Sequence, residues 1–227
     1  MTWAPLWLSL EIATIAMIVS LVTGTGLALL MRWRRLPLPD LFDAVVSAPL
    51  VLPPTVLGYY LLVALGPDSF IGRAYHAVFG SSITFTFTGA VIAATVGSLP
   101  LVVRSVRVGL DSVEPNLLAA ARTLGASPLR VLVTVTLPLA APGLIAGAML
   151  GFARALGDYG MTQMIASERF NGLFGIQNTS PASIFVYDEL VAMREDAARN
   201  MAIATTALGI AMLFLANRLT RRLHRAR

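Results

Sequence analysis

The chain of 227 residues contains no cysteine and no lysine, so all 17 of its basic side chains are arginines. Without cysteine there can be neither a disulfide framework nor a thiolate metal site. The two histidines, His76 and His224, are far apart and lack an HExxH or similar spacing, so no metal site is expected. Charged residues make up 13% of the chain and hydrophobic residues 56%. This balance is too apolar for one soluble domain and indicates a protein of the lipid bilayer.

The net charge of +5 does not indicate nucleic-acid binding, because the arginines lie at the ends of long uncharged runs. The positive-inside rule places basic residues there when they flank membrane spans on the cytoplasmic side. The chain also lacks a Walker A sequence and a GxGxxG turn between a strand and a helix. No cofactor is therefore expected, and if transport is active, its energy must come from a partner.

Five apolar runs predict five principal membrane-spanning helices, since a helix needs about 20 apolar residues to cross the hydrocarbon core. The runs are residues 12–31, 44–67, 90–103, 131–153 and 200–217. The first run lacks a basic segment before it and a cleavage pattern after it, so we interpret it as an uncleaved span.

The segments between these runs are harder to interpret. An amphipathic helix on the outer surface could cover residues 70–79, and another could cover residues 184–193. The second of these could instead belong to a short sixth crossing or a re-entrant segment. The expected fold class is an all-α polytopic bundle of five to six transmembrane helices, forming a single domain over residues 1–227.

The arginines also predict an orientation. Twelve of the 17 fall on segments assigned to the cytoplasm: 32, 34, 35, 104, 107, 122, 130, 218, 221, 222, 225 and 227. The other five, at 73, 154, 169, 194 and 199, fall on the outer side or its margin. This bias predicts an outer N-terminus and a cytoplasmic C-terminus. Arg104 and Arg107 then mark the inner end of the third span, and an anion would meet no fixed cation inside the spans.

The second apolar run contains the sequence PLVLPPTVLGYYLL over residues 49–62. Pro53 and Pro54 each lack a backbone donor and obstruct a helix, so this span must kink or break. In lipid, the freed backbone groups need protein partners or a water-filled cavity. We therefore expect Pro53, Pro54, Thr55 and Gly58 to line a transport pathway, with a simple packing kink as the alternative.

The stretch FARALGDYG, residues 152–160, contains two opposite charges. Arg154 and Asp158 are four residues apart, on one face of a helix, where they can form an ion pair. We expect a structural pair near the outer membrane surface, and a contact with substrate is the alternative.

Residues 112–130 form a compact polar-tipped unit between two apolar runs. Pro115 suits the first position of a helix, and Gly125 suits the left-handed conformation that ends one. A second helix can begin at once at Ser127-Pro128. The sequence therefore predicts two short helices bent at Gly125, with a face at residues 119–121 so small that another protein could approach closely. An ordinary helical hairpin beside a membrane span is the alternative.

This unit resembles the EAA loop of ABC importer permeases. The residues that the resemblance assigns to the loop are Ala119, Ala120, Ala121, Arg122, Gly125, Ala126 and Pro138. In that family the loop is a pair of cytoplasmic coupling helices, docked in a groove on the ATPase subunit. Ala119 stands where the family has an acidic residue.

Four longer stretches together resemble the molybdate ABC transporter permeases, which have the MetI-like fold. They are residues 49–62, 87–110, 120–143 and 152–160. The resemblance implies an inner-membrane homodimer with one ATPase subunit on each copy, hence two, and a periplasmic or extracellular binding protein that delivers the substrate. The substrate implied is a tetrahedral oxyanion, molybdate or tungstate.

Two alternatives stay open. After Gly160 the match is poorer, so the same fold could carry sulfate or another anion. An intramembrane enzyme is a second alternative, but it needs ionisable residues inside its spans. The runs 12–31, 44–67 and 131–153 carry no charged residue, which argues against it.

Overall fold

The computed structural model describes residues 3–32, 38–166 and 169–225. Its helices are α1 (Ala4–Met31), α2 (Pro39–Val51), α3 (Pro54–Leu65), α4 (Phe70–Phe79), α5 (Phe87–Asp111), α6 (Pro115–Thr123), α7 (Pro128–Val131), the π-helix η1 (Leu132–Thr136), α8 (Leu137–Leu156), α9 (Gly160–Ile165), α10 (Ala182–Val191) and α11 (Glu195–Arg225). Within the described ranges, the one strand-like feature is an isolated antiparallel bridge between Phe170 and Thr179. The predicted all-α fold is confirmed.

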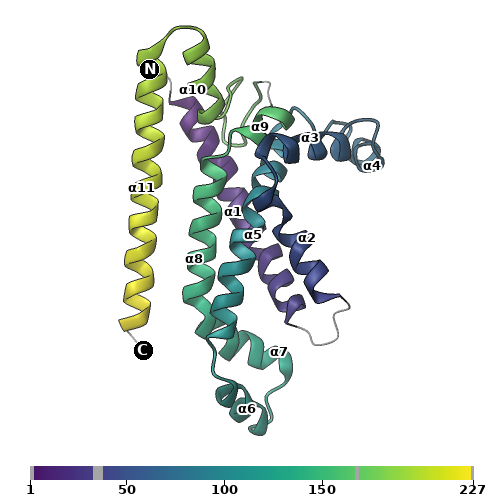
Figure 1. Ribbon diagram of the computed structural model, residues 1–227, viewed down its shortest axis with the longest axis vertical. Coiled ribbons are helices and arrows are strands. Elements are labelled where there is room, and N and C mark those ends of the chain that lie inside the picture. The colour runs from purple at the N-terminus through teal and green to yellow at the C-terminus, as the bar shows by residue number, and fades with distance from the viewer. Residues whose placement is uncertain (1–2, 33–37, 167–168, 226–227) are drawn as a thin grey trace.

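Helices α1, α5, α8 and α11 run along the long axis of the molecule (Figure 1). Helices α6 and α7 lie at one end, which we call the α6 end, and α3, α4, α9 and α10 lie towards the other, the α10 end. Helix α1 starts at the α10 end and α11 returns from it (Figure 1). The described residues therefore form one elongated bundle with short helices gathered at its two ends.

The core of the bundle is the contact among α1, α5 and α8, and small residues make it close. A Cβ atom on Gly109 of α5 would lie 2.8 Å from the Cα of Gly143 on α8. A Cβ atom on Gly24 of α1 would lie 3.0 Å from a methyl carbon of Val102 on α5. Helices in membranes approach one another through such small residues, because lipid offers no hydrophobic force to drive them together.

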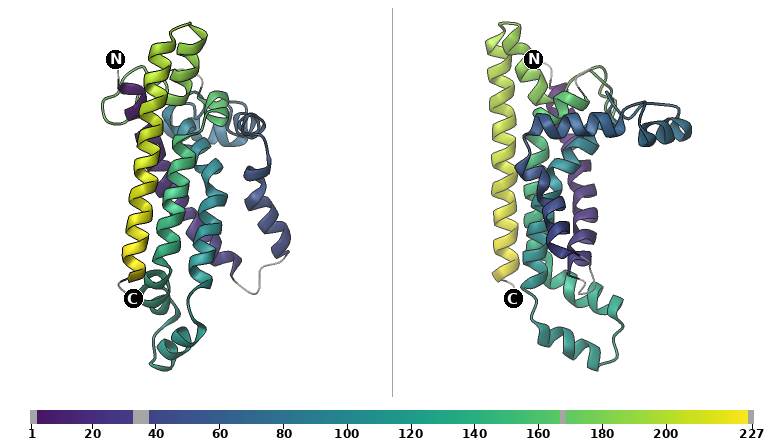
Figure 2. Two further views of the ribbon diagram at one scale, coloured as in Figure 1. Left: turned by 60° about the vertical axis from the view of Figure 1, so that its left-hand side comes forward. Right: turned by 45° about the vertical axis from the view of Figure 1, so that its right-hand side comes forward.

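The second apolar run is broken where the two prolines predict a break. Helices α2 and α3 are bent by 114° relative to each other, with Leu52 and Pro53 between them. Figure 2 shows α3 and α4 lying across the long axis of the bundle. Only α2 therefore runs lengthwise, and α3 turns aside near the α10 end.

In the described residues, four helices are long and apolar enough to span a membrane, and the broken pair raises the number to five. Helix α10, with 10 residues, reaches only about 15 Å at 1.5 Å per residue. It is too short to cross a bilayer and lies at the α10 end. Against the five spans expected, the described residues thus hold four, or five if the bent pair counts as one, and residues 184–193 do not add a further one. The surface helix expected at residues 70–79 is also found, as α4.

One helix boundary differs from its prediction. The third span was expected to end at Val103, but α5 continues to Asp111. Arg104 and Arg107 are therefore inside a long helix and do not mark its end. The prediction used charge as a sign of the membrane boundary, and a helix can continue past a charged residue when its backbone hydrogen bonds remain intact.

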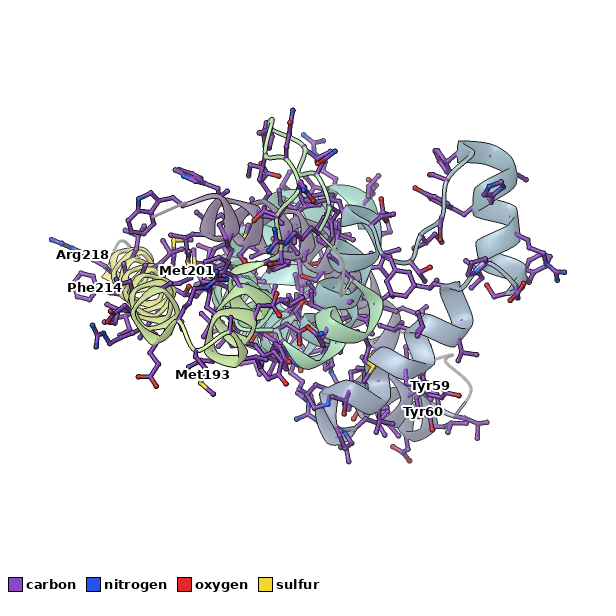
Figure 3. All side chains as sticks on the ribbon, turned by 90° about the horizontal axis from the view of Figure 1, so that it is seen from above. Tyr59, Tyr60, Met193, Met201, Phe214 and Arg218 are labelled. Carbon is purple, nitrogen blue, oxygen red and sulfur yellow. The ribbon has the colours of Figure 1, made fainter. Side chains whose placement is uncertain are left out.

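The helices at the edge of the bundle bury little. Helix α2 has no buried residue among those described, and α11 exposes a series of large apolar side chains that includes Ile203, Ile210 and Phe214. Seen along the bundle, Tyr59 and Tyr60 of α3 lie on the opposite side from Phe214 and Arg218 of α11 (Figure 3). Two apolar surfaces on opposite sides are therefore left for lipid or protein to cover.

Candidate coupling loop and transport pathway

The predicted two-helix unit is present at the α6 end. Pro115 begins α6, and Gly125 has a φ of +80°, in the left-handed region that favours glycine. The backbone N–H of Gly125 donates to the carbonyl of Arg122 at 2.9 Å, and that of Ala126 donates to the carbonyl of Ala121 at 3.2 Å. These bonds satisfy carbonyls that the end of α6 leaves free. The chain then turns, as predicted, into α7.

Helix α7 begins at once because Ser127 caps it. The Ser127 side-chain oxygen accepts a hydrogen bond from the backbone N–H of Arg130 at 3.4 Å. Serine at this position is a frequent helix start. The bend between α6 and α7 is therefore encoded locally, by one glycine and one capping serine.

The tip of this unit exposes leucines as well as alanines. Ala119, Ala120 and Arg122 are exposed, and Ala121 and Ala126 are half-buried. Leu117, Leu124 and Leu129 are 47%, 88% and 69% exposed. The helical spacing of Leu117 and Leu124 in the sequence indicates one apolar face, but it gives no sign that this face is uncovered. We refer to Leu117, Leu124 and Leu129 as the leucine tip; large exposed apolar side chains in a cluster are typical of a protein interface.

The unit joins α8 through a stretch of π-helix, η1, which sequence reasoning did not foresee. The hydroxyl of Thr136 donates to the carbonyl of Val131, five residues earlier, at 3.3 Å. Pro138 follows near the start of α8, which continues η1 without a break. Single π-turns often mark functional positions in helices. Here the π-turn lies between the leucine tip and a membrane span.

The residues expected to line a pathway differ in their exposure. Pro53, Pro54 and Thr55 are exposed at the bend between α2 and α3, whereas Gly58 is buried. A Cβ atom on Gly58 would lie 2.8 Å from the Cβ of Met164 on α9. In this chain Gly58 thus lets α3 pack against α9, and the exposed surface at the bend includes the other three residues.

The predicted pair of Arg154 and Asp158 is present at the corner between α8 and α9, with a nitrogen to oxygen distance of 2.8 Å. The Asp158 side chain is 1% exposed, and its other oxygen accepts from the backbone N–H and the hydroxyl of Thr162, at 2.9 and 2.8 Å. The carboxylate therefore both pairs with Arg154 and caps α9. Burial, helped by the charges of Tyr187 and Asp188, raises the pKa of the neighbouring Tyr159.

A second carboxylate, that of Glu11, anchors the loop after α9. Glu11 of α1 is 9% exposed and accepts from the backbone N–H groups of Leu173 and Phe174, at 2.9 and 3.3 Å. A side chain on Gly172 would collide with the Glu11 carboxylate. The loop at the α10 end is thus fixed to the bundle by a contact between residues more than 160 positions apart.

Comparison with known proteins identifies the family. Residues 13–227 match the model of the binding-protein-dependent transport system inner membrane component. The chain belongs to this family. The Escherichia coli (strain K12) molybdenum transport system permease protein ModB is 40% identical over 219 residues, which cover 96% of this chain and 93% of that protein.

Two further likenesses widen the comparison. The sulfate transport system permease protein CysT of Salmonella typhimurium (strain LT2) is 31% identical over 238 residues, covering 99% of this chain and 83% of that protein. An inward-facing structure of the MetNI methionine ABC transporter has a TM-score of 0.74 at 19% identity, covering 98% of this chain and 97% of that one. This likeness confirms the MetI-like fold.

Family membership bears on two of the sequence predictions. The chain is a multi-pass component of the inner membrane, as predicted. The family is one of transport components, which argues against an intramembrane enzyme. No cluster of three or more His, Cys, Asp or Glu side chains that could hold a metal is found in the part of the chain that the structure describes.

Proposed function

We propose that this inner membrane component is the permease subunit of an ABC importer for a tetrahedral oxyanion, molybdate or tungstate, with ATP hydrolysis on a separate subunit. The observation that carries the proposal is the unit of α6 and α7. It extends beyond the spans and exposes the leucine tip at the α6 end (Figure 1). Apolar side chains in that position need a protein partner, because lipid lies only around the sides of the bundle.

The partner proposed at the α6 end is the ATPase. The small residues 119–121 allow its surface to approach closely, Leu124 and Leu129 supply apolar area, and Arg122 supplies charge. Gly125 provides the bend, the half-buried Ala126 follows it, and Pro138 lies near the start of α8, the helix that carries the motion onward. This end is then cytoplasmic, and α1 begins outside.

A homodimer with two ATPase subunits accounts for the exposed edges of the bundle. Five spans with two uncovered apolar sides enclose no pathway alone, whereas two copies can enclose one between them. Closure of the ATPase pair around ATP would draw the two coupling loops together and open the bundle outward. Hydrolysis would reset it, giving alternating access driven from one end.

The pathway is proposed to run beside the bend between α2 and α3. Pro53, Pro54 and Thr55 are exposed there and leave backbone groups that lipid cannot satisfy. Gly58 contributes by holding α3 against α9, so that the bend keeps its place. A periplasmic or extracellular binding protein would deliver the anion at the α10 end, where short helices and the loop fixed by Glu11 form the surface.

The substrate follows from the relatives. The molybdenum permease from Escherichia coli is 40% identical to this chain, and the sulfate permease from Salmonella typhimurium is 31% identical. These values favour molybdate or tungstate and keep sulfate as the second candidate. Molybdate, tungstate and sulfate are all tetrahedral anions with two negative charges, so the fold alone does not choose among them.

The test is uptake by the complete transporter in proteoliposomes, with its ATPase and binding protein present. We expect ATP-dependent accumulation of labelled molybdate that excess tungstate abolishes and excess sulfate leaves nearly unchanged. Equal competition by sulfate would transfer the proposal to a sulfate importer. Active ATP hydrolysis without uptake of any of the three anions would overturn it.

A further inference from the structure

Arg104 lies deeper in the bundle than its place in the sequence suggests. At the α6 end, Arg32 donates to the carbonyl of Leu110 at 2.8 Å, and this contact joins the ends of α1 and α5. Arg104 lies six residues before Leu110, about 9 Å nearer the middle of the bundle at 1.5 Å per residue. It is therefore inside helix α5, on the inner half of the bundle, and not at the end of the helix.

The two arginines within this part of α5 have different partners. Arg107 forms an ion pair with Asp43 of α2. Arg104 is exposed, and its guanidinium donates only to the hydroxyl of Ser47 at 3.2 Å; no carboxylate lies within ion-pair distance of it in the described ranges. An unpaired arginine at this depth is costly against lipid and is usually found facing a water-filled cavity.

Such a space adjoins Arg104. A groove of about 450 Å³ lies along α5 and α8, and it is lined by Arg104, Ser105, Val108, Gly109, Ser112, Pro142, Gly143 and Ala146. The close contact between the backbones of Gly109 and Gly143 forms the bottom of this groove. Arg104 is the one charged side chain in this lining, and Ser105 adds a hydroxyl group next to it. The groove is therefore polar at one edge and large enough for a tetrahedral oxyanion.

We propose that Arg104 is the anion-contacting residue of the inner half of the pathway, with the hydroxyl of Ser105 as a second donor. This inference rests on the proposed function. A guanidinium presents several N–H donors in one plane and matches the spacing of oxyanion oxygens. In a homodimer, two copies of Arg104 would balance the double negative charge. Because the side chain is exposed to water, the contact is weak enough to release the anion.

The first test compares uptake with ATP hydrolysis in the reconstituted transporter. We expect Arg104→Gln to slow molybdate uptake about tenfold, the order expected for losing a charge-assisted hydrogen bond, while the binding protein still stimulates ATP hydrolysis. Arg104→Lys, which keeps the charge, should retain most of the uptake. Wild-type uptake by Arg104→Gln would overturn the inference and leave the importer itself established; absence of uptake by the wild type would instead reject the proposed function.

A substitution of Ser47, the hydrogen-bond partner of Arg104, distinguishes a purely structural role of Arg104 from contact with the anion. If Arg104 only pins α2 to α5, then Ser47→Ala removes the same hydrogen bond and should slow uptake as much as Arg104→Gln does. If Arg104 contacts the anion, Ser47→Ala should transport at nearly the wild-type rate. Equal losses in the two variants would therefore overturn the proposal.

The second test measures the local potential directly, using a chain that has no native cysteine. Val108 is 71% exposed in the same groove, one helical turn from Arg104. In a Val108→Cys variant, Arg104 should raise the reaction rate of an anionic methanethiosulfonate relative to that of a cationic one. Adding Arg104→Gln removes this charge and should lower the ratio of the two rates. We expect the ratio of the two rates to fall by about tenfold, because a charge within a few ångströms acts strongly on a reagent in a narrow groove. Arg199→Gln, at the far end of α11, should leave the ratio unchanged, and an unchanged ratio in Arg104→Gln would refute the assignment.

Discussion

The α5–α8 pair and helix α11 are both membrane helices, yet they are held in opposite ways. Along α5 and α8, Gly109 and Gly143 bring the two backbones together, and a Cβ atom on either would collide with the other. Along α11, Gly209 has nothing within 4 Å of the position its Cβ would occupy, and Phe214 is 65% exposed. One contact is complete within the chain, and the other surface is uncovered.

The difference shows which part of the chain is a scaffold and which part needs its surroundings. Close packing in lipid depends on the shape of the contact, because apolar area alone gives no advantage over lipid tails. The α5–α8 pair has that shape. The outer faces of α2, α3 and α11 lack it, so their stability and position depend on lipid, on a second copy, or on both. This contrast can be tested by single substitutions.

The largest effect is expected from Gly109→Leu. The Cβ atom alone would lie 2.8 Å from the Cα of Gly143 and 2.9 Å from the carbonyl oxygen of Ala140, so the two backbones must separate. We expect a loss of roughly 3 kcal/mol or more, seen as failure to recover folded protein by size exclusion in detergent.

Gly209→Leu is the matched control, with the same change on α11. It should leave recovery and melting temperature near those of the wild type, because the position is open. If Gly209→Leu yields a stable protein that no longer assembles as a dimer, the contrast is sharpened, since α11 would then face the second copy. Wild-type recovery of Gly109→Leu would show that the contact of α5 with α8 is not the scaffold.

The next effect concerns two ion pairs with different burial. Asp158 is 1% exposed and pairs with Arg154, whereas Asp196 is 87% exposed and pairs with Arg199. Asp158→Ala leaves a half-buried arginine without its partner and removes the cap of α9, so we expect a loss of about 3 kcal/mol in thermal unfolding. Asp196→Ala should not change the melting temperature measurably, because water replaces an exposed partner. Equal shifts in the two variants would contradict this account.

The leucine tip is a third kind of surface: it is apolar and uncovered, but it faces water and not lipid. Leu124→Asp should leave folding unchanged, since the side chain is 88% exposed, but reduce the affinity for the ATPase by about 2 kcal/mol, the size of an interface hot spot. Co-purification of the ATPase and the melting temperature of the permease alone are the two measurements. A lower melting temperature with normal co-purification would place Leu124 in the fold and not in the interface.

Local signals explain which of these features the sequence could predict. Pro53-Pro54, Gly125 and Ser127 act on the backbone within a few residues, so the break after α2 and the bend between α6 and α7 followed from them directly. The spacing of Arg154 and Asp158 predicted their pair for the same reason. Charged residues at the edge of an apolar run were less informative, because a flanking arginine and an arginine inside a longer helix have the same appearance in one sequence.

Long-range features could not be predicted in this way. Glu11 meets residues 173 and 174 only after the whole chain has folded, and the burial of Gly58 depends on the position of α9. The π-turn of η1 has no known signal in its five residues, Leu132–Thr136. Exposure of the leucine tip also depends on tertiary structure, since leucine at helical spacing usually indicates a buried face.

The smallest effect distinguishes the two uncovered sides of the bundle from each other. Thr55 is exposed at the bend between α2 and α3, where freed backbone groups require water or protein, and Leu213 is 40% exposed on α11. A thiol must ionise to react with a methanethiosulfonate, and ionisation needs water.

Thr55→Cys should therefore react several-fold faster than Leu213→Cys in the intact transporter, because a hydrated thiol ionises more readily than a thiol that faces lipid. ATP should change the rate at Thr55→Cys, because alternating access opens and closes the pathway, and should leave Leu213→Cys unchanged. If both positions react at one rate with and without ATP, then the bend does not border the pathway, and α3 and α11 are equivalent lipid-facing surfaces.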